Sequence, residues 1–397
     1  MSFIRIRQLL FLVHMWIGLV LGILAALLGL SGSAIVYDQE IADFLDPPPH
    51  AVATGPVLSL DAIVDVARAI AKHDQLQIAL PVIAGQPVLM RVGQISRMGP
   101  MSETGGREGR RHRHAARSEG GAAPEGGPGR SKLLFLDPVS GSVLGTRAAA
   151  MPPFLVFAHQ LHGNFLMGRD GRSLVVGWLG VAMLILGATG LVLWWPRGGQ
   201  WKYAFLVRRT AKGLRFHREL HAAAGIWIFA VFMAVSFSGV VLAWPQAMGM
   251  SPAGPSSPPH VEPIEGVDAI GADGALKLAE AALPDATPRS ITLPAHPDQP
   301  ISVAFLSHGS VPATVLVDPY RATVIARRDP SGSFLGWQRP IHQGTLHPIW
   351  RFLVFLTGFA PALFVVTGIT MWVKKRRRHV TMNEPLAPQW VEGGAAK

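Results

Sequence analysis

The sequence predicts an integral membrane protein: an all-α four-helix transmembrane bundle that carries two small α+β domains, with an internal duplication. Three observations lead to this fold class. Hydrophobic residues make up 49% of the 397 residues, whereas charged residues make up only 15%. Four apolar stretches are each long enough to cross a bilayer. The order of apolar stretches and short motifs in the first half of the chain recurs in the second half.

The four apolar stretches are expected to be membrane-spanning helices. Such a helix needs about 20 consecutive apolar residues. A buried helix of a soluble protein usually has a polar face, which these stretches lack. The first stretch exceeds the roughly 7–15 apolar residues of a cleaved signal peptide, so it is expected to remain in the protein. The predicted spans cover residues 9–37, 172–195, 222–244 and 352–373.

Lysine and arginine are concentrated in three places next to these spans. Arg5 and Arg7 precede the first span, a basic link joins the second to the third, and "KKRRR" follows the fourth. Because positive charges beside spans stay in the cytoplasm, three segments are expected there: 1–8, 196–221 and 374–397. The long segments 38–171 and 245–351 then lie outside. The net charge of +11 is largely this orientation signal, and it does not indicate nucleic-acid binding.

The two halves of the chain match at fixed offsets. An offset of 207 places His14 on His221, and an offset of 178 places Thr189 on Thr367. The outer segments also match, because "LLFLDPVSGSVLG" pairs with "TVLVDPYRATVIA". Each outer segment has a helical stretch followed by alternating, β-branched strands, which predicts two small α+β units. A basic low-complexity insertion at 99–130 interrupts the first unit and is expected to be disordered.

His14 and His221 lie near the cytoplasmic ends of their spans. An even number of crossings makes the two copies parallel, so equivalent residues lie at equal depth and can face each other. Both histidines are followed by glycine in the pattern H-x-x-x-G, which leaves an open surface beside the imidazole. Two facing neutral imidazoles suit bis-histidine ligation of a b-type haem. The chain has no cysteine, which excludes cysteine-ligated iron–sulfur clusters and covalent haem attachment through C-x-x-C-H.

Four histidines lie at the outer ends of the spans. "FAHQLHGNF" offers His159 and His162, and "PIHQGTLHPIW" offers His342 and His347. His162 lies 27 residues before its matching threonine (189 − 162) and His342 lies 25 before its own (367 − 342), so these two are favoured as ligands of a second haem. His159 and His347 remain alternatives, and His347 precedes Pro348, which also suits a helix cap. Each histidine also has a simpler interpretation, as an interfacial residue facing lipid headgroups.

Other residues near these histidines have two interpretations each. Three arginines flank the outer histidines and suit pairing with haem propionates or anchoring at the membrane surface: Arg172, Arg339 and Arg351. Four aromatic residues either pack within the bundle or lie between the two haems: Trp16, Trp178, Trp227 and Phe364.

In their order and spacing the motifs "HMWIGLVLG", "QLHGNFL", "TGLVLWWPR", "ELHAAAGIW" and "PIHQG" resemble the PepSY-associated transmembrane family, which includes iron-regulated inner-membrane proteins and siderophore-iron reductases. The resemblance covers nearly the whole chain. It implies two PepSY-like periplasmic domains, two b-type haems, and electrons that cross a bacterial inner membrane to reduce ferric siderophore iron. His14 and His221 match the family's inner ligand positions, and His162 and His342 match its outer ones. The insertion and His347 depart from the pattern.

The electron donor is expected to be quinol or a separate cytosolic reductase, because no G-x-G-x-x-G follows a strand on the cytoplasmic side. Two non-enzymatic functions remain as alternatives. One is a metal or siderophore transport accessory whose histidines bind metal directly, although the predicted spans contain no Asp or Glu. The other is a PepSY-type regulatory membrane protein.

Overall fold

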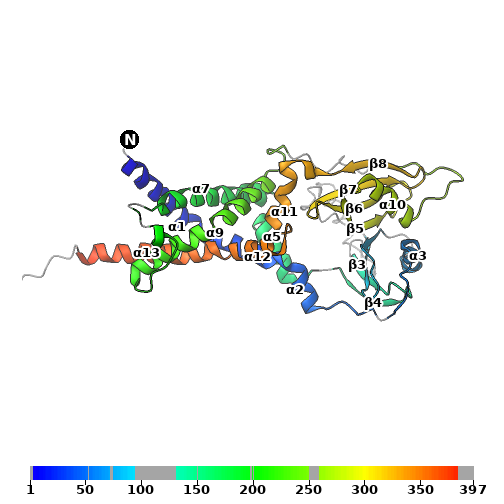
Figure 1. Ribbon diagram of the computed structural model, residues 1–397, viewed down its shortest axis with the longest axis horizontal. Coiled ribbons are helices and arrows are strands. Elements are labelled where there is room, and N and C mark those ends of the chain that lie inside the picture. Colours follow the sequence, from blue (N-terminus) through cyan, green and yellow to red (C-terminus); the bar gives the residue numbers. More distant parts are fainter. Residues whose placement is uncertain are drawn as a thin grey trace, which may run out of the picture.

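The computed structural model describes residues 3–51, 53–71, 75–93, 131–149, 151–196, 199, 201–249 and 259–382. A helical bundle forms one end of the molecule and a β-sheet forms the other (Figure 1). The N-terminus and helix α13 (Ala360–Met382) lie at the end of the bundle that is far from the sheet. The predicted insertion at 99–130 lies outside the described residues.

Among the described residues, four helical segments are long and apolar enough to cross a membrane: Ile4–Val36, Arg172–Trp194, Gly213–Ala243 and Pro348–Arg377. They are built from α1 (Phe3–Val36), the π-helix η1 (Arg172–Val176) continued by α7 (Gly177–Trp194), α9 (Gly213–Ala243), and α12 (Pro348–Thr357) followed by α13. Helix α1 packs against α7 and α13, and α9 packs against the same two helices. Helices α1 and α9 therefore stand diagonally across the bundle.

The fourth segment is interrupted between α12 and α13. At this point Gly358 faces Gly29 of α1 so closely that a Cβ on either glycine would meet the backbone of the other. The hydroxyl of Ser33 donates to the carbonyl of Phe355 at 2.7 Å. Small residues permit this close approach of two helices, and it fixes α12 against the outer half of α1.

The described parts of the two outer segments form one antiparallel sheet. Its eight strands have the order β4-β3-β2-β1-β5-β6-β7-β8. The first four strands are β1 (Leu76–Ala79), β2 (Val88–Val92), β3 (Lys132–Leu136) and β4 (Val143–Ala148). The last four are β5 (Ala286–Leu293), β6 (Ile301–Ser307), β7 (Val311–Asp318) and β8 (Thr323–Arg328). Each set of strands follows its own helix, α3 (Leu60–Ile70) or α10 (Ala272–Ala282).

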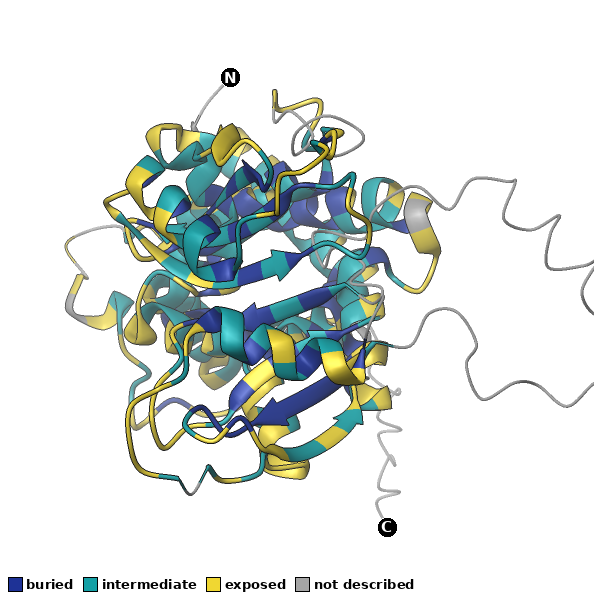
Figure 2. Cartoon of the chain, turned by 90° about the vertical axis from the view of Figure 1, so that its right-hand side faces the viewer, coloured by how far each residue is buried: buried dark blue, intermediate teal, exposed yellow. Residues whose placement is uncertain are grey.

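The expectation of two units is therefore met only in part, because the units share one sheet. Strand β1 pairs with β5, with Leu76 opposite Leu293 and Ala79 opposite Ser290. This pairing satisfies the backbone groups that each unit alone would leave open at a sheet edge. Residues from both units also form one hydrophobic core between the sheet and its two helices, including Ile63, Ile78, Ala275, Ile291 and Val303 (Figure 2).

Helices α3 and α10 cap each other. Asp273, in the first turn of α10, accepts hydrogen bonds from the backbone N–H of Leu60 (3.2 Å) and Asp61 (3.0 Å) in α3. Asp61 accepts in return from the N–H groups of Ala272 and Asp273. Carboxylates at helix N-termini satisfy orphan N–H donors and favour the helix dipole. The two units are therefore joined through their helices as well as through β1 and β5.

We expect Asp61→Ala and Asp273→Ala each to destabilise the sheet domain by about 1 kcal/mol, the usual cost of a lost N-terminal cap. Each substitution removes acceptors from the partner helix, so hydrogen exchange should accelerate in α10 for the first variant and in α3 for the second. Asp65→Ala is the matched control, because Asp65 is exposed on α3. Equal exchange in all three variants would contradict the mutual capping.

Short helices connect the bundle to the sheet. Helix α2 (Asp38–Leu45) follows α1, and α5 (Pro153–Asn164) and α6 (Gly168–Gly171) precede η1. After β8 come the 3-10 turns η2 (Pro330–Gly332) and η3 (Phe334–Trp337) and then α11 (Gln338–Gln343). A further short helix, α8 (Trp201–Ala204), connects α7 to α9 within the bundle. Helix α5 packs on α1 and α11 packs on α9, at the end of the bundle that faces the sheet (Figure 1).

Candidate functional site

Two histidines meet inside the bundle at its end far from the sheet. His14 comes from α1 and His221 from α9, and the centres of their rings are 6.1 Å apart with an angle of 74° between the ring planes. Their helices are diagonal neighbours, so the two rings meet near the bundle axis. We call this the inner pair.

Each ring of the inner pair is held by a threonine. His14 Nδ1 lies 2.9 Å from the hydroxyl of Thr189, which itself lies 2.6 Å from the Ile185 carbonyl. His221 Nδ1 lies 2.7 Å from the hydroxyl of Thr367, which bonds a carbonyl of its own helix in the same way. A hydroxyl that donates its only proton to a carbonyl must accept from the imidazole. Nδ1 of each ring is therefore the protonated nitrogen, and Nε2 keeps its lone pair.

A second pair of histidines meets at the sheet end of the bundle. His162 of α5 and His342 of α11 have ring centres 5.8 Å apart and ring planes tilted by 36°. His162 Nδ1 lies 2.9 Å from the carbonyl of Leu28, and His342 Nδ1 lies 3.0 Å from that of Val235. A carbonyl can only accept, so Nδ1 donates and Nε2 is again left with a lone pair. We call this the outer pair.

Glycines allow the outer rings to lie against the long helices. A Cβ on Gly32 of α1 would stand 2.7 Å from Cε1 of His162, and one on Gly239 of α9 would stand 3.0 Å from Cε1 of His342. The glycines of the H-x-x-x-G pattern play no such part: Gly18 is nearest to a leucine and Gly225 to a phenylalanine. A Cβ on either glycine would meet one side-chain atom at 3.9 Å, an ordinary contact distance, and the open surface expected beside the inner imidazoles stays a prediction.

The two alternative outer histidines have other contacts. His159 Nε2 lies 2.8 Å from a carboxylate oxygen of Asp38. His347 is the N-cap of α12, and its Nδ1 accepts from the N–H of Ile349 at 3.2 Å. The structure thus brings His162 and His342 together and leaves His159 and His347 outside this contact.

Five of the remaining predicted residues fall into two groups, those with partners inside the protein and those that face outward. Arg351 binds Glu40 and the Val36 carbonyl and lies over the ring of Tyr37, 4.4 Å from its centre, so protein groups already occupy its guanidinium. Phe364 packs on His221, with ring centres 4.7 Å apart. The three tryptophans face outward instead, with exposed fractions of 55%, 61% and 71% for Trp16, Trp178 and Trp227.

Both pairs have the spacing of two imidazoles that share one metal. A metal–nitrogen bond of about 2.0–2.1 Å, extended by about 1.1 Å to each ring centre, puts the two ring centres about 6.3 Å apart. The inner pair, at 6.1 Å, and the outer pair, at 5.8 Å, agree with that value. The anchored Nδ1 atoms fix which nitrogen is free, as the partners of metal-binding histidines usually do. These residues therefore fit a haem, whose porphyrin supplies the other four donors.

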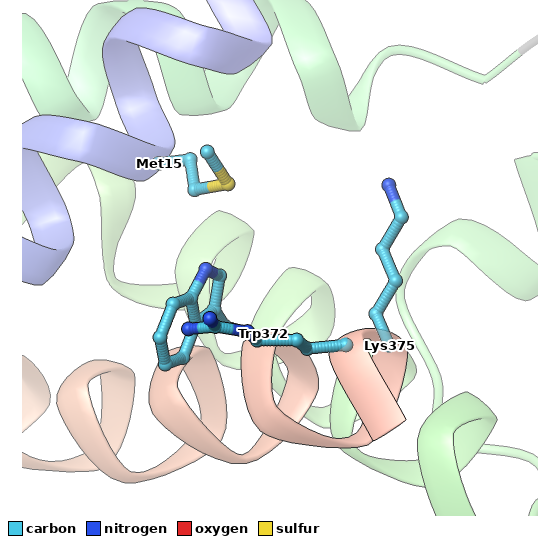
Figure 3. A pocket seen from close by; sticks show the side chains of 4 residues that line it. Met15, Trp372 and Lys375 are labelled. Carbon is cyan, nitrogen blue, oxygen red and sulfur yellow. The ribbon is translucent and has the colours of Figure 1, made fainter. Parts of the chain in front are cut away.

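An open cavity of about 370 Å³ lies at the same end of the bundle as the inner pair. It is lined by Met15, which follows His14 in α1, and by Trp372, Lys375 and Arg376 of α13 (Figure 3). The guanidinium of Arg376 stands 5.5 Å from the centre of the Trp372 ring. The cavity thus combines an apolar wall with two cations, which suits a flat ring that carries polar oxygens.

Sequence comparison agrees with the resemblance drawn from the motifs. Curated proteins give no match to this chain. The sequence pattern of the PepSY-associated TM region matches residues 11–375, which include both histidine pairs and most of each of the four membrane helices. The chain therefore belongs to the PepSY-associated transmembrane family.

Proposed function

We propose that this protein is a di-haem b electron-transfer protein of the bacterial inner membrane, which reduces ferric siderophore iron on the periplasmic side with electrons from the cytoplasmic side. The observation that carries the proposal is the two facing histidine pairs, each with Nδ1 anchored and Nε2 free. His14 and His221 would hold one haem, and His162 and His342 the other. Bound haem supplies one-electron redox chemistry.

The two histidine pairs would divide the path of an electron across the membrane into shorter steps. Leu28, which anchors His162, follows His14 by 14 residues (28 − 14) in the same helix, and Val235 follows His221 by 14 (235 − 221). Fourteen residues of α-helix span about 21 Å. Between the two pairs, Ala25 of α1, Met183 of α7 and Phe232 of α9 form a buried apolar cluster. A ferric chelate would meet the outer pair from the side of the sheet, and reduction would weaken its hold on the metal.

Repeated contacts support the proposed internal duplication. The two histidine–threonine contacts involve residues 207 (221 − 14) and 178 (367 − 189) apart, and the two carbonyls that anchor the outer pair are also 207 (235 − 28) apart. The donor would be quinol or a cytosolic reductase. The cavity at Met15 and Trp372 supports quinol, because its apolar wall and cations suit that headgroup.

A reduced-minus-oxidised spectrum tests the proposal. Full-length protein purified after expression with sufficient haem should show a b-type α band, and a pyridine haemochrome assay should approach two haems per chain. A transport accessory or a PepSY-type regulator needs no haem. Absence of the band from a folded, haem-supplied preparation would therefore exclude the reductase and leave those two functions.

The proposed orientation predicts opposite locations for two points on the chain. A reporter fused at residue 205, between α7 and α9, should lie in the cytoplasm, because basic residues surround this link. A reporter at residue 60, at the start of α3, should lie in the periplasm. Alkaline phosphatase and green fluorescent protein fusions measure the two locations. Equal signals at both positions would rule out the arrangement with both termini inside.

A further inference from the structure

The proposed internal repeat relates two helix contacts in the bundle, α1 with α13 and α9 with α7. The offset of 207 places α9 on α1, and the offset of 178 places α13 on α7. Trp372 of α13 is therefore the counterpart of Trp194 at the end of α7 (372 − 178 = 194). The surroundings of these two tryptophans can be compared directly.

In the α7–α9 contact, the link that contains α8 covers Trp194. The rings of Trp201 and Phe205 lie 5.9 Å and 5.2 Å from the Trp194 ring, measured between ring centres. The indole N–H of Trp194 donates to the Ala204 carbonyl at 2.9 Å. Phe205 also contacts Trp227 of α9, with ring centres 6.0 Å apart. The link therefore fills this contact between two membrane helices with aromatic rings.

Within the described part of the chain, no aromatic ring packs on Trp372. Trp372 is 36% exposed, and the guanidinium of Arg376 stands 5.5 Å from its ring centre. The open cavity of about 370 Å³ lies at this tryptophan, with Met15 of α1 facing it (Figure 3). We call this the α1–α13 cavity. It lies where the other half of the chain holds the rings of its own link.

Two cations line the α1–α13 cavity. Lys375 and Arg376 both belong to α13, and Nζ of Lys375 stands 5.6 Å from the ring centre of Phe11. Among the residues that the structure describes, no carboxylate pairs with either cation. Ammonium and guanidinium groups can donate hydrogen bonds to ring oxygens, and an aromatic wall favours a flat ring. Phe11 and Ile369 are exposed on the membrane helices, so a lipid-soluble molecule can reach the cavity from the bilayer.

We propose that the α1–α13 cavity binds the ring of a membrane quinol, in the place that the rings of the link occupy beside Trp194. This inference rests on the proposed function, in which quinol is one of two donors. The two cations alone would also suit a phospholipid phosphate, but the aromatic rings packed on the counterpart tryptophan favour a planar ring.

The α1–α13 cavity lies close to the inner pair along both helices. Met15 directly follows His14 in α1. Trp372 lies five residues past Thr367 (372 − 367), whose hydroxyl holds His221, and five residues of α-helix span about 8 Å. Oxidation of one quinol to quinone releases two electrons and two protons. The electrons would pass one at a time to haem at the inner pair, and the protons would pass to cytoplasmic water.

Three substitutions change the α1–α13 cavity in different ways. Trp372→Leu removes its aromatic wall, Lys375→Gln removes one cation, and Met15→Trp fills the space with a ring, as the link does in the other half. Trp16→Leu is the matched control for the tryptophan, because Trp16 is 55% exposed but does not line the cavity. Lys374→Gln is the control for the lysine, since Lys374 is also outside the lining. Each variant is prepared as full-length, haem-supplied protein.

The probe is ubiquinone-1, an oxidised short-chain quinone that binds without giving electrons. Isothermal titration calorimetry should show binding about tenfold weaker in each of the three cavity variants, the effect of losing one aromatic contact or one charged hydrogen bond. Both controls should bind like the unsubstituted protein. Reduction of the inner haem by ubiquinol-1, followed through its α band, should slow in the same three variants.

The proposal is overturned if ubiquinone-1 does not bind, or if the cavity variants bind it as well as their controls do. It is also overturned if Lys375→Gln loses copurified phosphatidylglycerol while its quinone affinity stays unchanged, because the cavity would then hold a phospholipid headgroup. Failure of the proposed function gives a different result. Protein without haem whose cavity variants bind ubiquinone-1 more weakly would refute the reductase and keep the quinone site. Haem-loaded protein that accepts electrons from a cytosolic reductase but binds no quinone would do the reverse.

Discussion

Alanine at His14 or at His221 is expected to remove the inner haem and to leave the outer one in place. The ring centres of the two imidazoles are 6.1 Å apart, from diagonal helices, so each would supply one of the two protein ligands of the haem iron. The pyridine haemochrome value should fall from about two per chain to about one in each variant. The double variant should lose no more, because residues that act as a unit give non-additive effects. Reduction of a ferric siderophore by a cytoplasmic donor should fall to background in all three.

Controls on the same helices separate ligand loss from general damage. His217→Ala removes a histidine one turn before His221, at a ring that contacts the neighbouring Phe216, and both haems should stay. Thr189→Val removes only the acceptor of His14 Nδ1, and such outer partners typically change affinity 10- to 100-fold. It should weaken the inner haem without abolishing it. If both alanine variants kept two haems with unchanged spectra, the inner pair would not be a ligand pair.

The histidine pairs could be predicted because the internal repeat shows which residues lie at the same depth in the membrane. Residues that occupy the same position in two parallel copies lie at the same level, so the offset of 207 was enough to place His14 opposite His221. The threonines were visible as repeated residues, but their role was not. A hydrogen bond between α1 and α7 depends on how the helices are rotated, and the low amphipathicity of these apolar helices leaves that rotation unspecified.

The contacts of the outer pair could not be derived in the same way. After α5 the chain turns through Phe165 and Leu166, which have positive φ angles of 53° and 63°. This left-handed conformation is rare outside glycine, so residue types alone do not predict it at Phe165 and Leu166. The turn leads into the π-helix at Arg172–Val176. Together these irregular segments let α5 pack back onto α1 and bring His162 to the Leu28 carbonyl.

The single sheet was also beyond prediction from sequence. The pairing of Leu76 with Leu293 joins residues of opposite halves of the chain. The residue patterns of β1 and β5 alone do not show whether each strand lies at the edge or in the centre of a sheet. The mutual capping by Asp61 and Asp273 fixes that choice through side chains. Each acid looks like an ordinary first-turn residue of its own helix.

Alanine at His162 or at His342 is expected to remove the outer haem and to keep the inner one. Their ring centres are 5.8 Å apart, and backbone carbonyls hold both Nδ1 atoms. The haemochrome value should again fall to about one per chain. The remaining haem should still accept electrons from the cytoplasmic side, because His14 and His221 are untouched. Transfer to the ferric siderophore should stop. The outer variants should therefore fail at the last step of electron transfer, whereas the inner variants should fail at the first.

The neighbouring histidines make this prediction selective. His159 is bound to Asp38 and His347 caps α12, so His159→Ala and His347→Ala should each keep two haems. These variants should change local stability only, since one loses a hydrogen bond to Asp38 and the other a helix cap worth about 1 kcal/mol. Loss of the outer haem in His159→Ala or His347→Ala, with full retention in His162→Ala and His342→Ala, would transfer the ligand role to the alternative pair. Because carbonyls of α1 and α9 fix the two favoured rings while Asp38 and Ile349 hold the other two, the structure leads us to expect the opposite result.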